Sequence, residues 1–160
     1  MIRQALTTDA SRIAEILVFS KRTNYRSIFH NDAYSFGELQ VCLIAQAYKE
    51  DDALLARTWV YTEEATDAYT KDRVELVKGL IEVQDAEIKT LYVDSFFTGE
   101  GIGQQLIRFA TENLGAERLW VLEKNHRAIA FYERNGFHTT GKRIQEDGTS
   151  EFLIEMKTDR

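Results

Sequence analysis

The spacing of apolar residues changes several times along the chain, and each change predicts a new element. Ile13, Ile16 and Leu17 recur at the spacing of a helix face, after residues 7–9, which are suited to cap a helix. The stretch from residue 54 to residue 61 is short and alternates aromatic side chains with others, which is typical of a strand. The chain therefore mixes helices with strands from its start.

Continued to the end of the chain, the pattern predicts the element order β-α-α-β-β-β-α-β-α-β-β. Helices are expected after the cap at residues 7–9 and then at residues 36–48, 102–114 and 127–134. Strands are expected at residues 2–5, 54–61, 74–83, 88–93, 119–122, 137–144 and 151–156. Residues 63–72 are polar and are expected to form an exposed connection. We therefore expect one α/β domain over residues 1–160, with helices flanking a mixed, largely antiparallel central sheet.

The most informative stretch is residues 88–114, where a predicted strand, a loop and a helix follow one another. The loop has three glycines at alternate positions, namely Gly99, Gly101 and Gly103. Glycine lets the backbone approach a ligand closely, and the first N–H groups of a helix lack partners at the positive end of its dipole. This unit predicts a site for phosphate oxygens, although a tight turn without any ligand would use the same residues.

Two common nucleotide-binding motifs do not fit the glycine spacing. A P-loop requires Lys and then Ser or Thr after its last glycine, whereas Gly103 is followed by Gln104 and Gln105. The dinucleotide fingerprint requires its third glycine three positions after the second, which this loop lacks. The loop therefore points to a different phosphorylated ligand, and a nucleotide binder becomes the weaker alternative.

The same loop resembles the coenzyme A loop of the GNAT superfamily of N-acyltransferases, whose pattern is Arg/Gln-x-x-Gly-x-Gly/Ala. Gly101 and Gly103 fall on the two defining glycines, while Thr98 stands where Arg or Gln is usual. Residues 119–137, LWVLEKNHRAIAFYERNGF, are similar to the following motif in a bacterial subgroup that ends Phe-Tyr-Glu-x-x-Gly-Phe. Residues 1–16 are similar to the first strand and helix of the same superfamily. The resemblance spans nearly the whole chain.

The resemblance implies the GNAT fold, in which the fourth and fifth strands splay apart and the pantetheine arm lies between them. It implies acetyl-CoA as co-substrate and direct transfer of the acetyl group to a primary amine. The backbone at residues 91–93 would hold the pantetheine and polarise the thioester carbonyl, and the glycine loop would hold the pyrophosphate. The implied cofactor contacts are Leu91, Tyr92, Val93, Thr98, Gly99, Glu100, Gly101, Ile102, Gly103, Gln104 and Asn125.

Two catalytic roles are also implied by the resemblance. Tyr132 matches a tyrosine that often protonates the departing sulfur, and this role is favoured over that of a core aromatic on the same helical face as Phe131. Glu87 aligns with a carboxylate that some members use as general base, often through water, and it is also compatible with a solvated strand end. Glu123 and His126 are further candidates for the base.

Composition narrows the class of protein. The net charge of −6 argues against a nucleic-acid binder, and no apolar run approaches the length of a membrane helix. Cys42 is the only cysteine, so we expect a reducing, cytoplasmic setting in which Cys42 is a buried inert thiol. No spacing of Cys and His suggests a metal site, and no signal peptide is expected.

Several questions stay open at the level of the sequence. A non-catalytic acyl-CoA-binding or regulatory module on the same fold would carry the same loop. The amine acceptor cannot be read from the chain, although its selectivity should lie in residues 22–33, after Trp59 and in the final strands. The aromatic-rich residues 25–30 are compatible with helix packing or with a cover for the substrate cleft. Pairing through an edge strand would make the protein a homodimer.

Overall fold

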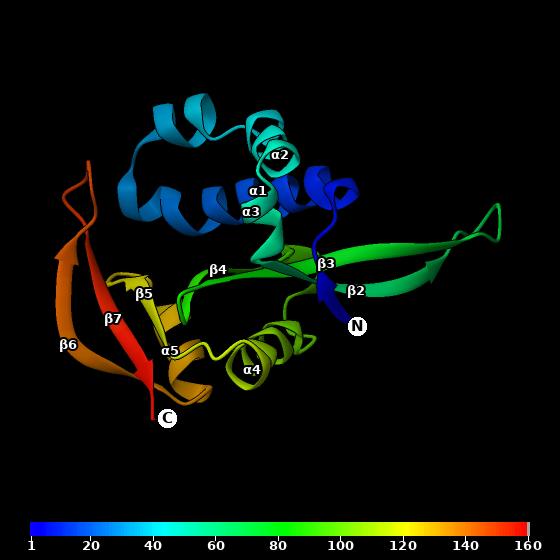
Figure 1. Ribbon diagram of the computed structural model, residues 1–160. Helices are drawn as coiled ribbons and strands as arrows, with labels where there is room; N and C mark the ends of the chain where they lie inside the picture. Colours follow the sequence, from blue (N-terminus) through cyan, green and yellow to red (C-terminus); the bar gives the residue numbers. More distant parts are fainter. Residues whose placement is uncertain (160) are drawn as a thin grey trace.

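The computed structural model describes residues 1–159, which form a seven-stranded sheet with helices on both faces (Figure 1). The strand order is β1-β2-β3-β4-β5-β7-β6, and every neighbouring pair is antiparallel except β4 and β5. This architecture confirms the predicted mixed, largely antiparallel sheet. The strands are β1 (Ile2–Gln4), β2 (Thr58–Thr66), β3 (Arg73–Gln84), β4 (Glu87–Val93), β5 (Arg118–Leu122), β6 (Phe137–Gln145) and β7 (Phe152–Thr158).

The helices divide between the two faces of the sheet (Figure 1). One face carries α1, α2 and α3, and the other carries α4 and α5. No helix within residues 1–159 combines the length and the apolar character needed to cross a membrane. The helices are α1 (Ala10–Phe29), α2 (Val41–Glu50), α3 (Asp52–Ala56), α4 (Ile102–Asn113) and α5 (His126–Arg134).

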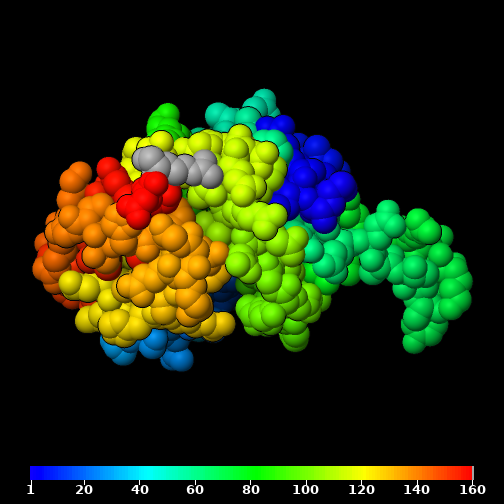
Figure 2. Space-filling view, turned by 90° about the horizontal axis from the view of Figure 1, so that it is seen from below, coloured from blue at the N-terminus to red at the C-terminus, as the bar shows by residue number. Residues whose placement is uncertain are grey.

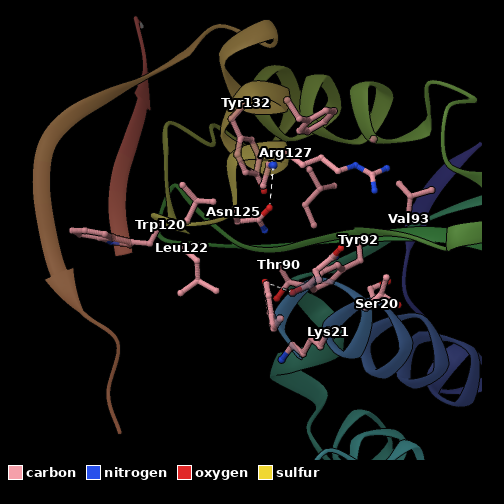
Figure 3. A pocket seen from close by; sticks show the side chains of 18 of the residues that line it. Ser20, Lys21, Thr90, Tyr92, Val93, Trp120, Leu122, Asn125, Arg127 and Tyr132 are labelled. Carbon is pink, nitrogen blue, oxygen red and sulfur yellow. Dashed lines mark hydrogen bonds between the residues drawn. The ribbon is translucent and has the colours of Figure 1, made fainter. Parts of the chain in front are cut away.

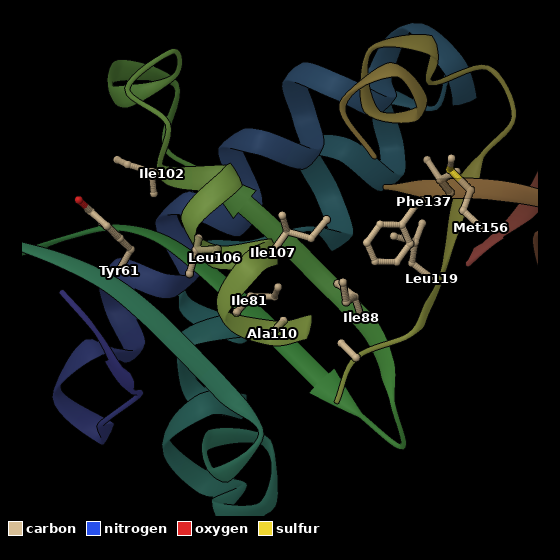
Figure 4. Close-up of a cluster of buried hydrophobic side chains, with 12 residues drawn as sticks. Tyr61, Ile81, Ile88, Ile102, Leu106, Ile107, Ala110, Leu119, Phe137 and Met156 are labelled. Carbon is tan, nitrogen blue, oxygen red and sulfur yellow. The ribbon is translucent and has the colours of Figure 1, made fainter. Parts of the chain in front are cut away.

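Each face of the sheet has its own apolar core. On the α4 face, the buried stripe of the helix packs on strand residues that include Ile81, Ile88 and Leu119 (Figure 4). On the α1 face, Ile13 and Ile16 pack in a second cluster that includes Leu80. Leu80 and Ile81 are neighbours on β3 that point to opposite faces, and both are fully buried. The strand β3 is therefore the central wall between the two cores.

Two predicted boundaries around the second strand are wrong. Residues 54–56 belong to α3, because the Asp51 side chain caps this helix by accepting a hydrogen bond from the Leu54 backbone N–H at 2.9 Å. The strand β2 instead continues to Thr66, so residues 63–66 pair with β3 rather than forming a connection. This part of the β2–β3 hairpin stands away from the body of the protein (Figure 2). Its β2 residues are mostly polar, while Val74 and Leu76 of β3 are exposed apolar side chains.

The N-terminal helical region also differs from the prediction. The helix α1 extends through the aromatic-rich stretch to Phe29 and ends where His30 adopts a left-handed conformation, with φ at 49°. Residues 33–38 form a separate π-helical turn, so α2 begins at Val41 instead of residue 36. Cys42 is exposed rather than buried, because it lies in the first turn of α2 ahead of the buried Ala45 and Tyr48.

Gly79 on β3 lets α4 approach the sheet. A Cβ at this position would lie 3.0 Å from the Tyr92 carbonyl oxygen and 3.2 Å from methyl carbons of both Ile102 and Leu106. We expect Gly79→Ala to lower the free energy of unfolding by about 1–3 kcal/mol, because the packed backbone and helix must move. Urea unfolding of the variant measures this change.

Gly37 provides the matched control, since a Cβ there would meet no atom within 4 Å. Gly37→Ala should leave the unfolding free energy within about 0.5 kcal/mol of the unsubstituted protein. Equal stability of the two variants would show that Gly79 is not needed for the close approach.

Candidate functional site

The parallel strands β4 and β5 separate soon after they meet. Their pairing is confined to two positions, Glu87 with Arg118 and Ile88 with Leu119. At the same level, Lys89 forms a β-bulge, because it is the extra residue between two successive pairs of β4 with β3. Bulges bend a strand and increase its twist, and they are frequent beside active sites. The two strands therefore diverge toward their carboxyl ends, as the resemblance implied.

A cleft of about 1550 Å³ opens where the strands diverge (Figure 3). Its walls come from β4, β5, the glycine loop, α1, α5 and the turn between β6 and β7. The cleft brings together most of the residues proposed from the sequence, namely Leu91, Tyr92, Val93, Thr98, Gly99, Gly101, Ile102, Gly103, Gln104, Asn125 and Tyr132. Glu87 and Glu100 are not among its lining residues. The structure thus places the lining residues together, while their roles in binding and catalysis stay predictions.

Two glycines of the loop have backbone conformations that other residues rarely adopt. Gly99 has a φ of 90° and Gly101 a φ of 78°, both in the left-handed region. Gly101 is also the N-cap residue of α4, and its carbonyl accepts the first helical hydrogen bond from Gln105 at 3.1 Å. The N-terminus of α4 therefore opens into the cleft with the N–H groups of its first turn, which have no partner within a helix.

Gly103 serves a different purpose from the other two glycines. Its φ is not in the left-handed region, and a Cβ there would lie 3.3 Å from the Phe131 ring and 3.7 Å from Val93. The missing side chain therefore lets α5 pack closely against α4. Gly103 lines the cleft, but the structural need for glycine at this position comes from helix packing.

The start of the loop is anchored to α1 by Asp94. Its carboxylate accepts a hydrogen bond from the Phe96 backbone N–H at 2.9 Å and one from the Arg12 guanidinium at 2.5 Å. Arg12 also donates to the Val77 carbonyl of β3 at 3.1 Å. The buried Asp94 thus ties the strand end, the loop and α1 together, which limits how far the loop can move.

A second anchor holds the middle of the loop. Lys78 lies over the Phe97 ring at 4.4 Å and within 3.6 Å of the Glu100 carboxylate. Its ammonium also pairs with Glu63, which helps to raise the pKa of Lys78. Glu100 is therefore engaged by Lys78 outside the cleft lining, so its side chain holds the loop in place in this structure.

Three tyrosine side chains, Tyr25, Tyr92 and Tyr132, line the cleft. Tyr132 of α5 packs against the rings of Phe131 and Phe137, with centroids 5.4 and 6.1 Å away. Burial raises its pKa, and the nearby Tyr25 raises it further. The hydroxyls of Tyr25 and Tyr92 hydrogen-bond to each other at 2.5 Å, and burial also raises the pKa of both groups. All three phenols therefore keep their protons at neutral pH.

The side chain of Tyr92 and the position of Tyr25 were not foreseen as parts of the site. The resemblance assigned only a backbone role to Tyr92, and Tyr25 belonged to an aromatic stretch with two open interpretations. The contact joins residues of α1 and β4 that are 67 positions apart in the sequence. No local sequence pattern predicts a pair this far apart. The only related signal was the aromatic stretch at the end of α1.

The candidate bases are held by cations or lie outside the cleft lining. The Glu87 carboxylate accepts from the Lys89 ammonium at 2.7 Å and from Arg118 at 3.3 Å, with 13% of its side chain exposed. The Arg143 guanidinium binds both oxygens of Glu123, which lowers the pKa of that carboxyl. Neither carboxylate lines the cleft, and neither does His126.

Asn125 begins α5 as predicted. Its side-chain oxygen accepts a hydrogen bond from the Ala128 backbone N–H at 3.2 Å, which is the geometry of an N-cap (Figure 3). Asn125 also lines the cleft, so the two interpretations of this residue are compatible.

Comparison with known proteins points to one family. Residues 54–139, more than half of the chain, match the sequence model of a family described as “Acetyltransferase (GNAT) domain”. The matched region runs from α3 to the start of β6 and includes the glycine loop.

Solved structures support the same fold. The apo form of YjaB from Escherichia coli has a TM-score of 0.71 and 21% identity, over 99% of this chain and 97% of that one. The PaiA N-acetyltransferase of Thermoplasma acidophilum, solved in complex with coenzyme A, has a TM-score of 0.63 and 20% identity over 98% of both chains. An N-acetyltransferase from Staphylococcus aureus Mu50 has a TM-score of 0.66 and 17% identity over 98% of both chains. At these identities the likeness establishes the arrangement of the elements.

Proposed function

Because the chain belongs to the GNAT acetyltransferase domain family, we propose that it moves an acetyl group from acetyl-CoA to a primary amine by direct attack. The observation that carries this proposal is the cleft between the diverging strands β4 and β5, which ends at the glycine loop and the N-terminus of α4. One end of the cleft thus suits phosphates, and its middle has an unpaired strand edge. A long phosphorylated thioester fits this combination.

The cofactor would use both features. The pyrophosphate would lie on the backbone N–H groups between Gly99 and Gln104, at the positive end of the α4 dipole. The pantetheine arm would run beside Leu91, Tyr92 and Val93, whose backbone groups on the β5 side have no strand partner beyond Ile88. The coenzyme A complex of the Thermoplasma acidophilum protein, which shares the fold, supports this placement.

Thr98 is uncharged and stands where Arg or Gln is usual, so a positive charge for the phosphates would have to come from another residue. Its hydroxyl donates to the Ser95 carbonyl at 3.0 Å, so it stabilises the loop itself. Arg127 lines the cleft, and its guanidinium points along the cleft toward Val93 (Figure 3). Within residues 1–159 no carboxylate pairs with Arg127. We infer that Arg127 binds a phosphate of coenzyme A where an Arg or Gln of the loop is usual.

Arg127→Met should therefore raise the Kd for acetyl-CoA by about 10-fold, because one charge-assisted hydrogen bond to phosphate is lost. Calorimetric titration at two salt concentrations measures the change, and the difference should shrink at high salt. Arg108→Met is the control, since Arg108 is exposed on α4, pairs with Glu112 and does not line the cleft. Equal Kd values for the two variants would remove Arg127 from the phosphate site.

The proposed chemistry needs few protein groups. The amine nitrogen attacks the thioester carbon, and backbone N–H groups of β4 stabilise the negative charge that develops on oxygen. Collapse of this species breaks the carbon–sulfur bond, and Tyr132 gives its phenolic proton to the departing sulfur. Glu87 remains a predicted base that would work through water past Lys89, which both lines the cleft and holds the Glu87 carboxylate.

Turnover with a defined amine mixture tests the proposal. The protein is incubated with acetyl-CoA and polyamines, amino acids and lysine-containing peptides, and free thiol and acetylated products are measured by absorbance and mass spectrometry. The proposal predicts that thiol release and an acetylated amine appear in equal amounts. Tight acetyl-CoA binding without any acetylated amine would instead indicate a non-catalytic acyl-CoA-binding module.

A further inference from the structure

A single lysine lies unpaired in the part of the cleft formed by α1. Lys21 lines the cleft from α1, below the strand that carries Thr90 and Tyr92 in the view of Figure 3. The residue is half-buried, and within residues 1–159 its ammonium makes no ion pair or hydrogen bond. Glu82 and Glu146 act on it only through space, and Glu82 is already bound by Arg57 at 2.7 Å.

This arrangement is unfavourable for the Lys21 ammonium. Partial burial removes water from the ammonium and lowers the pKa of Lys21. Other lysines of the chain avoid this cost by pairing with a carboxylate, namely Lys78, Lys89, Lys124 and Lys142. A partly buried cation without a partner is stabilised when a bound molecule supplies an anion.

The position of Lys21 separates it from the proposed phosphate site. The glycine loop, α4 and α5 lie on one face of the sheet, whereas Lys21 lies on α1 on the other face (Figures 1 and 3). A molecule that meets the thioester between β4 and β5 from the α1 face would contact Lys21. The anion expected at Lys21 therefore belongs to the acceptor and not to coenzyme A.

The same part of the cleft also carries negative charge. Glu38 lines it from the π-helical turn, and Glu146 and Asp147 line it from the turn between β6 and β7. No cation forms an ion pair with any of these three carboxylates within residues 1–159. The lone lysine and the three acidic residues together suit a molecule that bears a carboxylate and an ammonium group.

We propose that Lys21 binds the carboxylate of the acceptor, and that the acceptors of this protein are free amino acids or short amino-carboxylates. This inference rests on the proposed acetyl transfer and specifies its substrate class. The acidic residues would attract the ammonium form of the amine into the cleft, and Lys21 would orient the molecule so that its nitrogen faces the thioester. Lys21 is thus a specificity residue that contacts the acceptor.

The test compares acceptors that differ only by the carboxylate. Initial rates of thiol release are measured for a panel of amino acids and for the corresponding amino-acid amides, with the full-length protein and saturating acetyl-CoA. Lys21→Met removes the charge at similar length, and Lys21→Arg keeps it. Lys49→Met is the matched control, because Lys49 is an exposed lysine of α2 outside this cleft.

The unsubstituted protein should favour the acids. Lys21→Met should lower kcat/KM for the acids by about 10- to 100-fold, mainly through KM, and leave the amides within about twofold. Lys21→Arg should keep the preference for the acids, and Lys49→Met should match the unsubstituted protein. Preference for the amides, or an equal loss for acids and amides in Lys21→Met, would overturn the proposal.

A binding measurement separates failure of this inference from failure of acetyl transfer. The N-acetyl derivative of the best acid, or of each acid in the panel if none is acetylated, is titrated into the protein saturated with coenzyme A. Binding that weakens about 10-fold or more in Lys21→Met supports the carboxylate site even without turnover. Absence of binding, or binding that does not depend on Lys21, overturns the inference whether or not other amines are acetylated.

Discussion

Gly101→Asp is expected to raise the Kd for acetyl-CoA by more than about 100-fold while the protein stays folded. Gly101 has a φ of 78° and caps α4, and a Cβ there would meet no atom within 4 Å. The added side chain thus has room, and the left-handed conformation costs about 1–2 kcal/mol. Its carboxylate would occupy the place proposed for the pyrophosphate, where a second negative charge is repelled. Calorimetry and urea unfolding measure the two properties separately.

Two control variants separate the effect of backbone strain from the effect of the added negative charge. Gly115→Asp adds the same side chain at a φ of 65° with no atom within 4 Å, but at the other end of α4 and outside the cleft. It should lose similar stability and bind acetyl-CoA normally. Gly101→Ala adds strain without charge and should weaken binding by less than about 10-fold. Undiminished binding by Gly101→Asp would show that the loop does not hold the pyrophosphate.

Tyr132→Phe should lower kcat by roughly 10²- to 10⁴-fold and change the Kd for acetyl-CoA by less than about twofold. The phenylalanine keeps the ring contacts with Phe131 and Phe137, so only the hydroxyl is lost. Because the pKa of Tyr132 lies above its usual value near 10, the hydroxyl stays protonated from neutral pH to beyond pH 10. The unsubstituted protein should therefore show no fall in kcat from this group between about pH 7 and 10.

Tyr48→Phe is the matched control for loss of a buried hydroxyl. Tyr48 lies on α2 outside the cleft, and burial raises its pKa to about 12. This variant should keep the full kcat, whatever it costs in stability. If Tyr132→Phe behaves in the same way, Tyr132 is a packing residue and the sulfur takes its proton from elsewhere.

The strand, loop and α4 could be predicted because their signals are local. Gly99 and Gly101 occupy left-handed positions that favour glycine, and Gly115 ends the helix with a φ of 65°. The apolar spacing of α4 matches its buried face, from Ile102 to Ala110. Each of these signals depends on a few neighbouring residues, so the sequence pattern was sufficient.

The residues that line the α1 part of the cleft, where we propose that the acceptor binds, could not be predicted in the same way. Lys21 and Tyr25 reach the cleft because α1 packs across β4, and the hydrogen-bond partner of Tyr25, Tyr92, is distant in the sequence. The contact of Arg118 with Glu87 was missed for a similar reason, since Arg118 comes from the neighbouring strand β5. The extension of β2 over residues 63–66 was missed because this stretch is exposed and has no apolar alternation, whereas the β3 strand opposite it was predicted.

The most direct test of the account is a calorimetric titration of the protein with acetyl-CoA, compared with the same titration using ATP. We expect a saturable signal with a micromolar Kd for acetyl-CoA and no signal for ATP, because the cleft provides a strand edge for pantetheine beside the phosphate loop. No binding of acetyl-CoA, or equal binding of ATP, would contradict the assignment of the cleft.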